Sequence, residues 1–237
     1  MTRTASTPRR PSDARIPPLE NGDHLTREEF ERRYNAMPDG IKAELIEGIV
    51  YMAPPALRWD SHGGPHADLM GWLVVYRAAT PGVRVGDNAS IRLDLDNMPQ
   101  PDAAMIIEPS CGGQARLSAD DYLEGAPELA AEIAASTVSI DLNEKLRVYR
   151  RNGVREYVVW RVEDQAIDWF ALHGGQYVPL QSAADGLLHS AVFPGLWLDA
   201  GAMTHGRLSI VFEALHKGLA TPEHSAFVAE LESRKPR

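Results

Sequence analysis

The sequence predicts a mixed α/β domain, in which helices flank a central mixed β-sheet. Residues 129–135, LAAEIAA, form a short and almost wholly apolar run, which is typical of a buried strand. The next segment, 141–152, has helical periodicity. It begins with Asp141 and Glu144 at the spacing of a capping box, and an Asn-Gly pair ends it. Another apolar strand, 154–160, follows directly, and this alternation of strand and helix predicts the mixed class.

The composition fits one globular domain of ordinary size with tails: of 237 residues, 44% are hydrophobic and 24% are charged. Such a chain can bury a large core, so it needs no disulfide or metal to fold. The single cysteine, Cys111, excludes a disulfide framework and indicates a reducing, cytoplasmic environment. No stretch approaches about 18 apolar residues, so we expect no membrane-spanning helix. The net charge of −9 argues against a nonspecific coat of nucleic acid but allows a local basic groove.

Three regions are expected along the chain. Residues 1–22, whose composition is biased towards Pro, Arg, Ser and Thr, should form a disordered tail, and they lack the apolar region of a secretory signal. Residues 23–200 should form the folded domain, and residues 201–237 a helical extension. In that extension we expect helices over 207–219 and 222–233, the second with a proline in its first turn.

The folded domain should open with a helix and a hairpin. A capping box and a short apolar stripe predict a helix near residues 26–36. The runs 42–46 and 49–53 flank a Glu-Gly pair and predict a β-hairpin with a two-residue turn. Alternation places Glu44 in the middle of the first strand, whereas Glu47 lies in the turn, where we expect a solvated surface residue.

A helix over 66–79 should follow, with His66 at its start and facing inward. A structural histidine is the commoner outcome at such a place, and an accessory role in a functional site is the alternative. Strands are predicted at 83–86, 89–95 and 103–107, the last a fully apolar run.

The segment 108–126 is glycine-rich and long for a connection. It fits either a functional loop or lid, or an ordinary surface insertion. Farther along, strands at 166–172 and 176–180 flank Gly174-Gly175 and predict an antiparallel hairpin at one edge of the sheet.

The pattern directs a carboxylate and an ammonium inward. Glu132 lies in the middle of the buried run, where a lone charge is costly unless a cation or a set of donors meets it. In the next helix, Leu142, Leu146 and Tyr149 form one apolar stripe, and Lys145 lies on that stripe. The lengths of strand and helix allow the two charges to meet at one level. They could form a structural ion pair or part of an active site, and these two residues alone favour neither.

Three acids and one lysine come from neighbouring predicted elements: Glu44, Asp102, Glu132 and Lys145. Clustered carboxylates repel one another unless a cation holds them, and hard oxygen ligands select Mg²⁺ or Mn²⁺ rather than Zn²⁺. The sequence has no zinc-binding pattern, phosphate-binding glycine motif or nucleophile elbow. A Mg²⁺ site suits phosphodiester hydrolysis, because the metal generates a hydroxide-like nucleophile and an inward lysine stabilises the developing charge.

At these residues the chain resembles the Uma-type putative restriction endonuclease family of the PD-(D/E)XK nuclease superfamily. The resemblance extends over roughly residues 25–200, and its strength lies in the order and spacing of several motifs. These motifs are the hairpin AELIEGIVYMAPP at 43–55, His66 at the start of a helix, P-D at 101–102, E-x-x-x-S from Glu132, D-x-x-x-K at 141–145 and YRRNGVREY at 149–157.

The resemblance implies a restriction-endonuclease-like core. It implies that Asp102 and Glu132 ligate the metal, that Glu44 is an additional acid, and that Lys145 is the catalytic lysine. In the superfamily pattern the lysine stands two residues after the glutamate, where this chain has Ala134. The family shows the same shift, with a lysine supplied from the next helix.

Three function classes follow from these observations. The first is a Mg²⁺-dependent DNA endonuclease, expected to act as a homodimer. The second is a nuclease-fold protein that binds nucleic acid or a protein partner without turnover, which the acidic net charge favours modestly. The third is a hydrolase with paired carboxylates, such as a glycosidase, against which the inward lysine counts.

Overall fold

The computed structural model describes residues 16–53 and 58–235. Most of the expected N-terminal tail, residues 1–15, lies outside the described residues, as do residues 54–57 and 236–237. In the described part of the chain, no helix combines the length and the apolar character that crossing a membrane requires.

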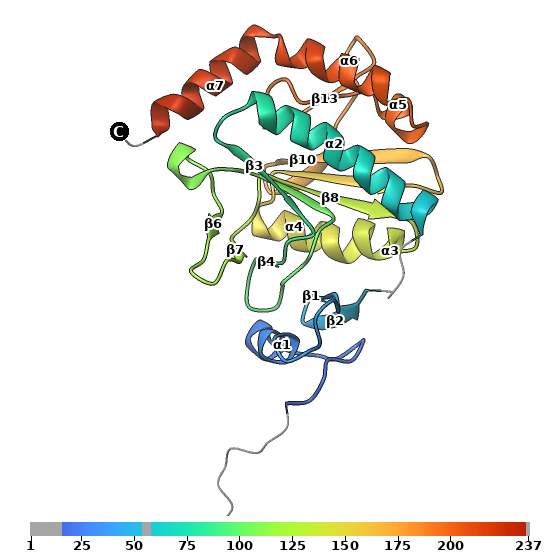
Figure 1. Cartoon of the computed structure of the whole chain (residues 1–237), viewed down its shortest axis with the longest axis vertical. Helices are drawn as coiled ribbons and strands as arrows, with labels where there is room; N and C mark the ends of the chain where they lie inside the picture. Colours follow the sequence, from blue (N-terminus) through green and yellow to red (C-terminus); the bar gives the residue numbers. More distant parts are fainter. Residues whose placement is uncertain (1–15, 54–57, 236–237) are drawn as a thin grey trace, which may run out of the picture.

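The core of the molecule is a six-stranded sheet (Figure 1). Its strands, in spatial order, are β11 (Gln176–Pro179), β10 (Ala166–His173), β9 (Glu156–Arg161), β8 (Leu129–Ala134), β5 (Ala103–Ile107) and β3 (Val83–Asp87). Strands β8 and β9 are parallel, whereas the other neighbours are antiparallel. The predicted class, a mixed sheet with a hairpin at one edge, is confirmed.

Helices cover both faces of this sheet (Figure 1). On one face lie α2 (Gly64–Ala79), α5 (Ala200–Thr204), α6 (Leu208–Leu219) and α7 (Pro222–Arg234). On the other face lies one continuous helical segment made of α3 (Val138–Ile140), the π-helical turn η3 (Asp141–Lys145) and α4 (Leu146–Asn152). The two predicted C-terminal helices correspond to α6 and α7.

Side chains along β8 alternate between these two faces. Leu129 and Ile133 belong to the apolar cluster under α2, whereas Ala130 and Ala134 belong to the cluster under α4. Glu132 has the same parity as Ala130 and Ala134, so the strand directs its carboxylate towards the α3–η3–α4 segment.

That helical segment begins earlier than predicted. It starts at Val138, so Asp141 lies inside it and the predicted capping box of Asp141 and Glu144 is wrong. The Thr137 hydroxyl donates a hydrogen bond to Asp141 Oδ2 at 2.5 Å, which turns the aspartate inward. A π-helical turn then spans Asp141–Lys145. A capping-box pattern depends only on the spacing of residues along the chain, so it reveals neither the earlier start of the helix nor the π-helical turn.

Other segments differ from their predictions as well. The expected strand over 89–95 is reduced to β4 (Ile91–Arg92), because its partner strand is equally short. It forms a small sheet with β6 (Arg116–Leu117) and β7 (Leu123–Glu124), so the segment 108–126 is an ordered part of the fold. The elements that the sequence did not predict are β6, β7, η1 (Trp59–Gly63), η2 (Pro109–Cys111), α5, β12 (Leu188–His189) and β13 (Trp197–Leu198).

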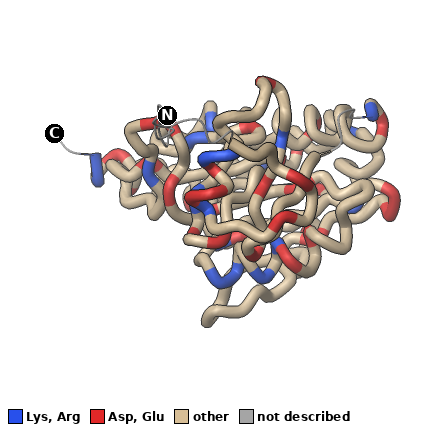
Figure 2. The backbone as a smooth tube through the Cα atoms, turned by 90° about the horizontal axis from the view of Figure 1, so that it is seen from below, with Lys and Arg blue, Asp and Glu red and all other residues tan. Residues whose placement is uncertain are grey.

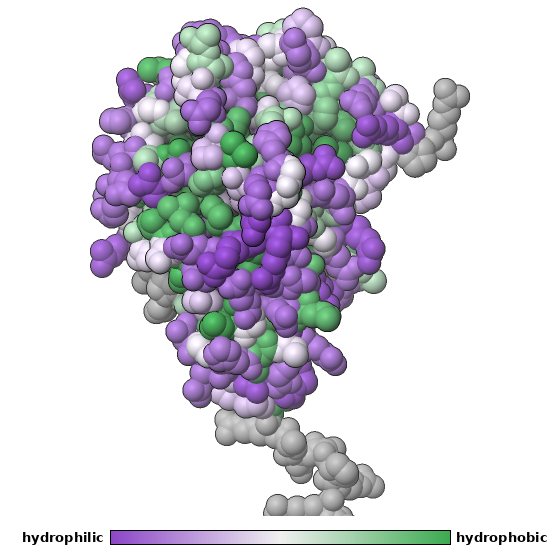
Figure 3. Space-filling model, turned by 180° about the vertical axis from the view of Figure 1, so that it is seen from behind, coloured by the Kyte–Doolittle hydropathy of each residue, from purple (hydrophilic) through white to green (hydrophobic). Residues whose placement is uncertain are grey.

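Helix α1 (Arg27–Tyr34) and the hairpin of β1 (Ala43–Ile46) and β2 (Ile49–Met52) form an N-terminal lobe beyond one end of the sheet (Figure 1). Both elements lie where the sequence predicted them. The lobe has an apolar cluster of its own, which includes Phe30, Leu45 and Val50. Along the backbone, acidic positions are interleaved with basic ones (Figure 2). Apolar side chains form small patches among hydrophilic residues (Figure 3).

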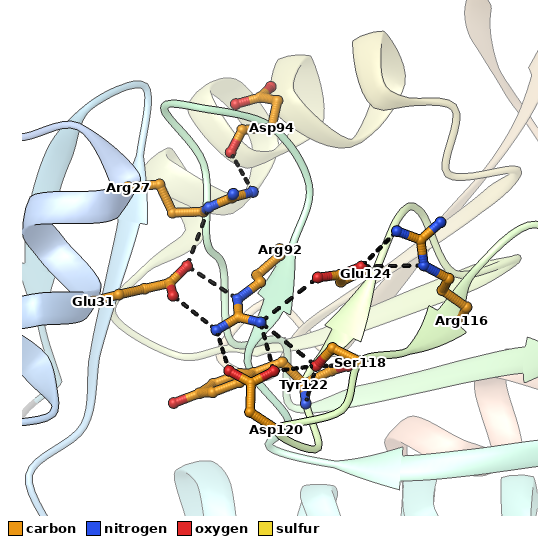
Figure 4. Close-up of polar contacts among 9 residues, drawn as sticks. All are labelled: Arg27, Glu31, Arg92, Asp94, Arg116, Ser118, Asp120, Tyr122 and Glu124. Carbon is orange, nitrogen blue, oxygen red and sulfur yellow. Dashed lines mark hydrogen bonds and ion pairs between the residues drawn. The ribbon is translucent and has the colours of Figure 1, made fainter.

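Arg92 on β4 joins the N-terminal lobe to the small sheet (Figure 4). Its Nη2 lies 2.8 Å from Glu31 Oε2 on α1 and 2.7 Å from Asp120 Oδ2, and its Nη1 lies 3.6 Å from Glu124 Oε1. The guanidinium carbon is 4.2 Å from the centroid of the Tyr122 ring. Arg92 therefore pairs with carboxylates from two parts of the chain, and two of these also pair with a second arginine, Glu31 with Arg27 and Glu124 with Arg116.

Replacing Arg92 with Met should loosen the N-terminal lobe. Asp120 would then lose its cation, whereas Glu31 would keep Arg27 and Glu124 would keep Arg116. Like charges that are partly removed from water repel, so the contact between the lobe and the small sheet weakens. We expect the amides of α1 to exchange at least about tenfold faster relative to those of β8, measured by hydrogen–deuterium exchange. Arg116→Met is the matched control, because Arg116 also binds Glu124 at 2.8 Å but is 75% exposed. Equal exchange in the two variants would contradict the role of Arg92.

Candidate functional site

Lys145 is buried at the end of η3, beneath three carboxylates. Its Nζ lies 2.9 Å from Glu44 Oε1, 3.1 Å from Glu132 Oε1 and 3.6 Å from Asp141 Oδ1. The residue is only 5% exposed. Burial alone would lower the pKa of Lys145, but the neighbouring carboxylates outweigh it and raise the pKa well above its usual value. The ammonium is therefore charged, and the predicted meeting of Glu132 with Lys145 is borne out by the structure.

Glu132 is almost fully buried, at 4% exposure. Its Oε1 forms the ion pair with Lys145 Nζ and accepts a hydrogen bond from the Tyr149 hydroxyl at 2.9 Å. Burial raises the pKa of Glu132 well above its usual range, and the charge of Lys145 only partly offsets this effect. The charge on this carboxylate therefore depends on the cation beside it.

Glu44 comes from β1 in the N-terminal lobe, as the hairpin alternation predicted. Its Oε1 binds Lys145, and its Oε2 accepts a hydrogen bond from the Gln100 N–H at 3.1 Å. The neighbouring turn residue, Glu47, is not simply solvated. Its carboxylate lies 2.9 Å from Arg147 Nη2 and 3.1 Å from Arg151 Nη1. The hairpin thus contacts the helical segment through an inner and an outer glutamate.

Asp102 immediately precedes β5 and lies opposite Glu132. Strands β5 and β8 are antiparallel, with Ala103 paired to Ala131, so the next position in register pairs residue 102 with residue 132. Asp102 Oδ2 accepts the Ile133 N–H at 2.7 Å, and Oδ1 lies 3.1 Å from His62 Nε2. Burial alone would raise the pKa of Asp102, but these two donors outweigh it, and the pKa is lowered. Within the described residues, the Asp102 carboxylate does not bind Lys145 directly.

His66 lies beside Asp102 but does not contact its carboxylate. Its Nε2 is 3.0 Å from the Asp102 backbone oxygen and 3.0 Å from Asp87 Oδ1. The histidine that does contact the carboxylate is His62, and this hydrogen bond raises the pKa of His62. His62 was not among the predicted site residues, because the predicted helix begins only at His66. A spacing of four residues between the two histidines would have indicated one helical face.

Asp141 also belongs to this group, although it was not among the predicted site residues. Asp141 is 1% exposed, and burial raises the pKa of its carboxyl group. Its Oδ1 has no hydrogen-bond partner among the described residues, although Lys145 Nζ lies 3.6 Å away. The signal that could have found it is its position four residues before Lys145, which places both on one face of the helix.

The donor chemistry of Asp102, Glu132 and Glu44 fits a hard divalent cation, because all three supply carboxylate oxygens. Across residues 16–53 and 58–235, however, no three His, Cys, Asp or Glu side chains are arranged so that they could together hold a metal ion. Mg²⁺ is commonly held by one or two carboxylates with water completing its shell. The arrangement therefore fits an ion held by Asp102 and Glu132, which face each other on adjacent strands, better than an all-protein cage.

Comparisons with known proteins agree with this fold. Residues 27–201 match the family model described as Uma2, putative restriction endonuclease. No curated protein sequence matches the chain. Among solved structures, the chain is similar to a crystal structure described as a putative nuclease belonging to DUF820 from Anabaena variabilis ATCC 29413. The match has a TM-score of 0.52 and 12% identity, and it covers 79% of this chain and 97% of that chain. At this identity the likeness shows the fold alone.

Replacing Lys145 with Met should destabilise the protein strongly. Removing one partner of a buried ion pair leaves uncompensated charge in the interior, which typically costs about 3–5 kcal/mol. The free energy of unfolding in urea measures this loss. Lys217→Met is the control, because Lys217 binds Glu213 at the same distance, 2.9 Å, but both side chains are exposed. An unfolding free energy that falls equally little in both variants would show that Lys145 is not buried as described.

Proposed function

Because the chain belongs to the Uma2 family of putative restriction endonucleases, we propose that it is a metal-dependent endonuclease that hydrolyses phosphodiester bonds in DNA. The observation that carries the proposal is the convergence of a buried ammonium with carboxylates from separate elements. Lys145 lies 3.1 Å from Glu132, and the strand register places Asp102 opposite that glutamate. A charged lysine beside two facing carboxylates suits phosphoryl chemistry better than a structural ion pair, which needs one acid only.

In this proposal Asp102 and Glu132 hold Mg²⁺, with Mn²⁺ as an alternative, and Glu44 is the additional acid. When bound, the ion lowers the pKa of a water ligand and neutralises charge on the phosphoryl group. Hydrogen bonds already fix both carboxylates: the Ile133 N–H and His62 hold Asp102, and the Tyr149 hydroxyl holds Glu132. Such outer partners orient the ligands of a metal site.

Lys145 supplies the fixed positive charge of the proposed centre. Its ammonium has three donors, so it can bind a carboxylate and a phosphoryl oxygen at the same time. Charge that develops on that oxygen in the transition state strengthens the second interaction. His66 has an accessory role, because it holds the backbone of Asp102 and not its carboxylate.

A second candidate function is that of a nuclease-fold protein that binds nucleic acid or a protein partner without turnover. Two observations favour it: Lys145 already binds Glu44 and Glu132, and the described residues include no ready group of three metal ligands. Calorimetry with Mn²⁺ separates the two functions. Binding of DNA or a partner without binding of Mn²⁺ would support the second candidate.

Cleavage of both DNA strands calls for two catalytic centres, so we also propose that the enzyme acts as a homodimer. Sedimentation velocity of the full chain with and without a DNA duplex tests this point. A single copy on each duplex, together with cleavage of both strands, would contradict it.

Replacing Asp102 with Asn, or Lys145 with Met, should reduce cleavage of supercoiled plasmid and branched DNA by at least about 100-fold. The first change weakens the ion's site, and the second removes the fixed positive charge. Cleavage is followed on gels with Mg²⁺, Mn²⁺ or EDTA. Asp68→Asn on α2 is the control, because it changes a partly buried aspartate outside the site. Equal inertness of the unaltered chain and both variants on all substrates would refute the nuclease proposal.

A further inference from the structure

The Asp141 carboxylate has one oxygen engaged and one free. Its Oδ2 accepts the Thr137 hydroxyl, whereas its Oδ1 is buried without a hydrogen-bond partner among the described residues. A buried carboxylate oxygen without a donor is costly, so its retention calls for an explanation. The nearest cation is the ammonium of Lys145, at 3.6 Å.

That distance lies just outside a hydrogen bond. Charge-assisted N–H···O bonds are about 2.7–2.9 Å long, so a movement of under about 1 Å would complete one between Lys145 and Asp141. The two residues are four positions apart in η3, so their separation is set by one turn of helix. The Tyr157 hydroxyl donates to the backbone oxygen of Asp141 at 3.0 Å and ties that turn to β9.

The ammonium has shorter contacts with two other carboxylates. These belong to Glu132, which the proposed function assigns to the divalent ion together with Asp102, and to Glu44, its additional acid. One cation cannot fully satisfy three acids, and a second cation would compete for the two glutamates. When Glu44 and Glu132 turn to the ion, Lys145 loses its closest counter-charges while it stays buried. A buried ammonium without a partner is strongly disfavoured.

We propose that Asp141 is a positioning residue, which receives the ammonium of Lys145 when Glu44 and Glu132 turn to the divalent ion. The inference rests on the proposed function. Asp141 keeps the lysine charged and beside the ion without occupying the ion's own ligands. Without the charge on Asp141, the ammonium has only the two glutamates as partners, and it competes with the ion for them.

Mn²⁺ affinity, measured by calorimetry on the full chain, tests this role without relying on cleavage. Asp141→Asn keeps the size of the side chain and an acceptor for Thr137, and it should weaken Mn²⁺ binding at least about tenfold. In a Lys145→Met background, Asp141→Asn should change Mn²⁺ affinity much less, because no ammonium is present for Asp141 to bind. Glu156→Gln is the control, because it neutralises another buried carboxylate, which binds Ser190 and Ala191 and not Lys145.

Thr137→Val provides a second and milder test. It removes the donor that turns Asp141 inward, so Asp141 Oδ1 is held less firmly beside the ammonium, and Mn²⁺ affinity should fall a few-fold, by roughly the strength of one hydrogen bond to a charged group. This variant also serves if Asp141→Asn fails to fold. Unchanged or tighter Mn²⁺ binding in Thr137→Val would overturn the proposal.

The remaining outcomes are distinct. Equal Mn²⁺ affinity of Asp141→Asn and the unaltered chain, or an equal loss in both lysine backgrounds, overturns the role of Asp141 and leaves the nuclease proposal intact. Absence of both Mn²⁺ binding and cleavage in the unaltered chain overturns the proposed function and this inference with it.

Discussion

The burial of one ammonium determines how the parts of this protein meet. Lys145 cannot leave water alone, because an unpaired buried charge costs several kcal/mol, on the order of 3–5. Its partners come from three places: β8 supplies Glu132, the N-terminal hairpin supplies Glu44, and the helical segment itself supplies Asp141. The lobe, the sheet and the helix are therefore joined at one electrostatic point, and the site is complete only when all three are in place.

The pKa values of Asp102 and Glu132, which are paired across adjacent strands, are shifted in opposite directions. Asp102 accepts two hydrogen bonds that favour its charged form, so its pKa is lowered. Glu132 lies deeper, and burial raises its pKa despite Lys145. The surroundings of Asp102 thus favour its charged form, whereas burial favours the neutral form of Glu132 and the charge of Lys145 opposes that effect. A pair of acids with such different surroundings is more typical of a functional centre than of a structural contact.

Much of the site could be predicted from the periodicity of the sequence. The parts that could not be predicted depend on single hydrogen bonds or on local irregularities of a helix or strand. Alternation along β8 directs Glu132 to the correct face, and the apolar stripe of the helix places Lys145 inward, so the central pair is predictable. The inward position of Asp141 is not predictable, because the same sequence fits either an aspartate that caps a helix or one that faces the interior. In the structure, the hydrogen bond from the Thr137 hydroxyl holds Asp141 inward. His62 was not predicted for a similar reason. A π-helical turn precedes α2 and extends the helix through a segment with glycines and a proline, which do not indicate a helix. The strand β4 is shorter than its alternation suggests, because its partner β7 offers only two residues.

The hairpin contacts the helical segment at two levels, and the difference between them bears on the site. Glu47 binds Arg147 and Arg151 at the surface, where exposed pairs contribute little and are screened by salt. Glu44 binds Lys145 in the interior, where the same kind of contact is far stronger. The outer pairs therefore orient the hairpin, whereas the inner pair holds it. If a divalent ion takes Glu44, the hairpin loses its strongest contact with the helix, and its remaining ion pairs with the helix are the outer ones of Glu47. Occupation of the proposed centre and docking of the N-terminal lobe are thus coupled through a single glutamate.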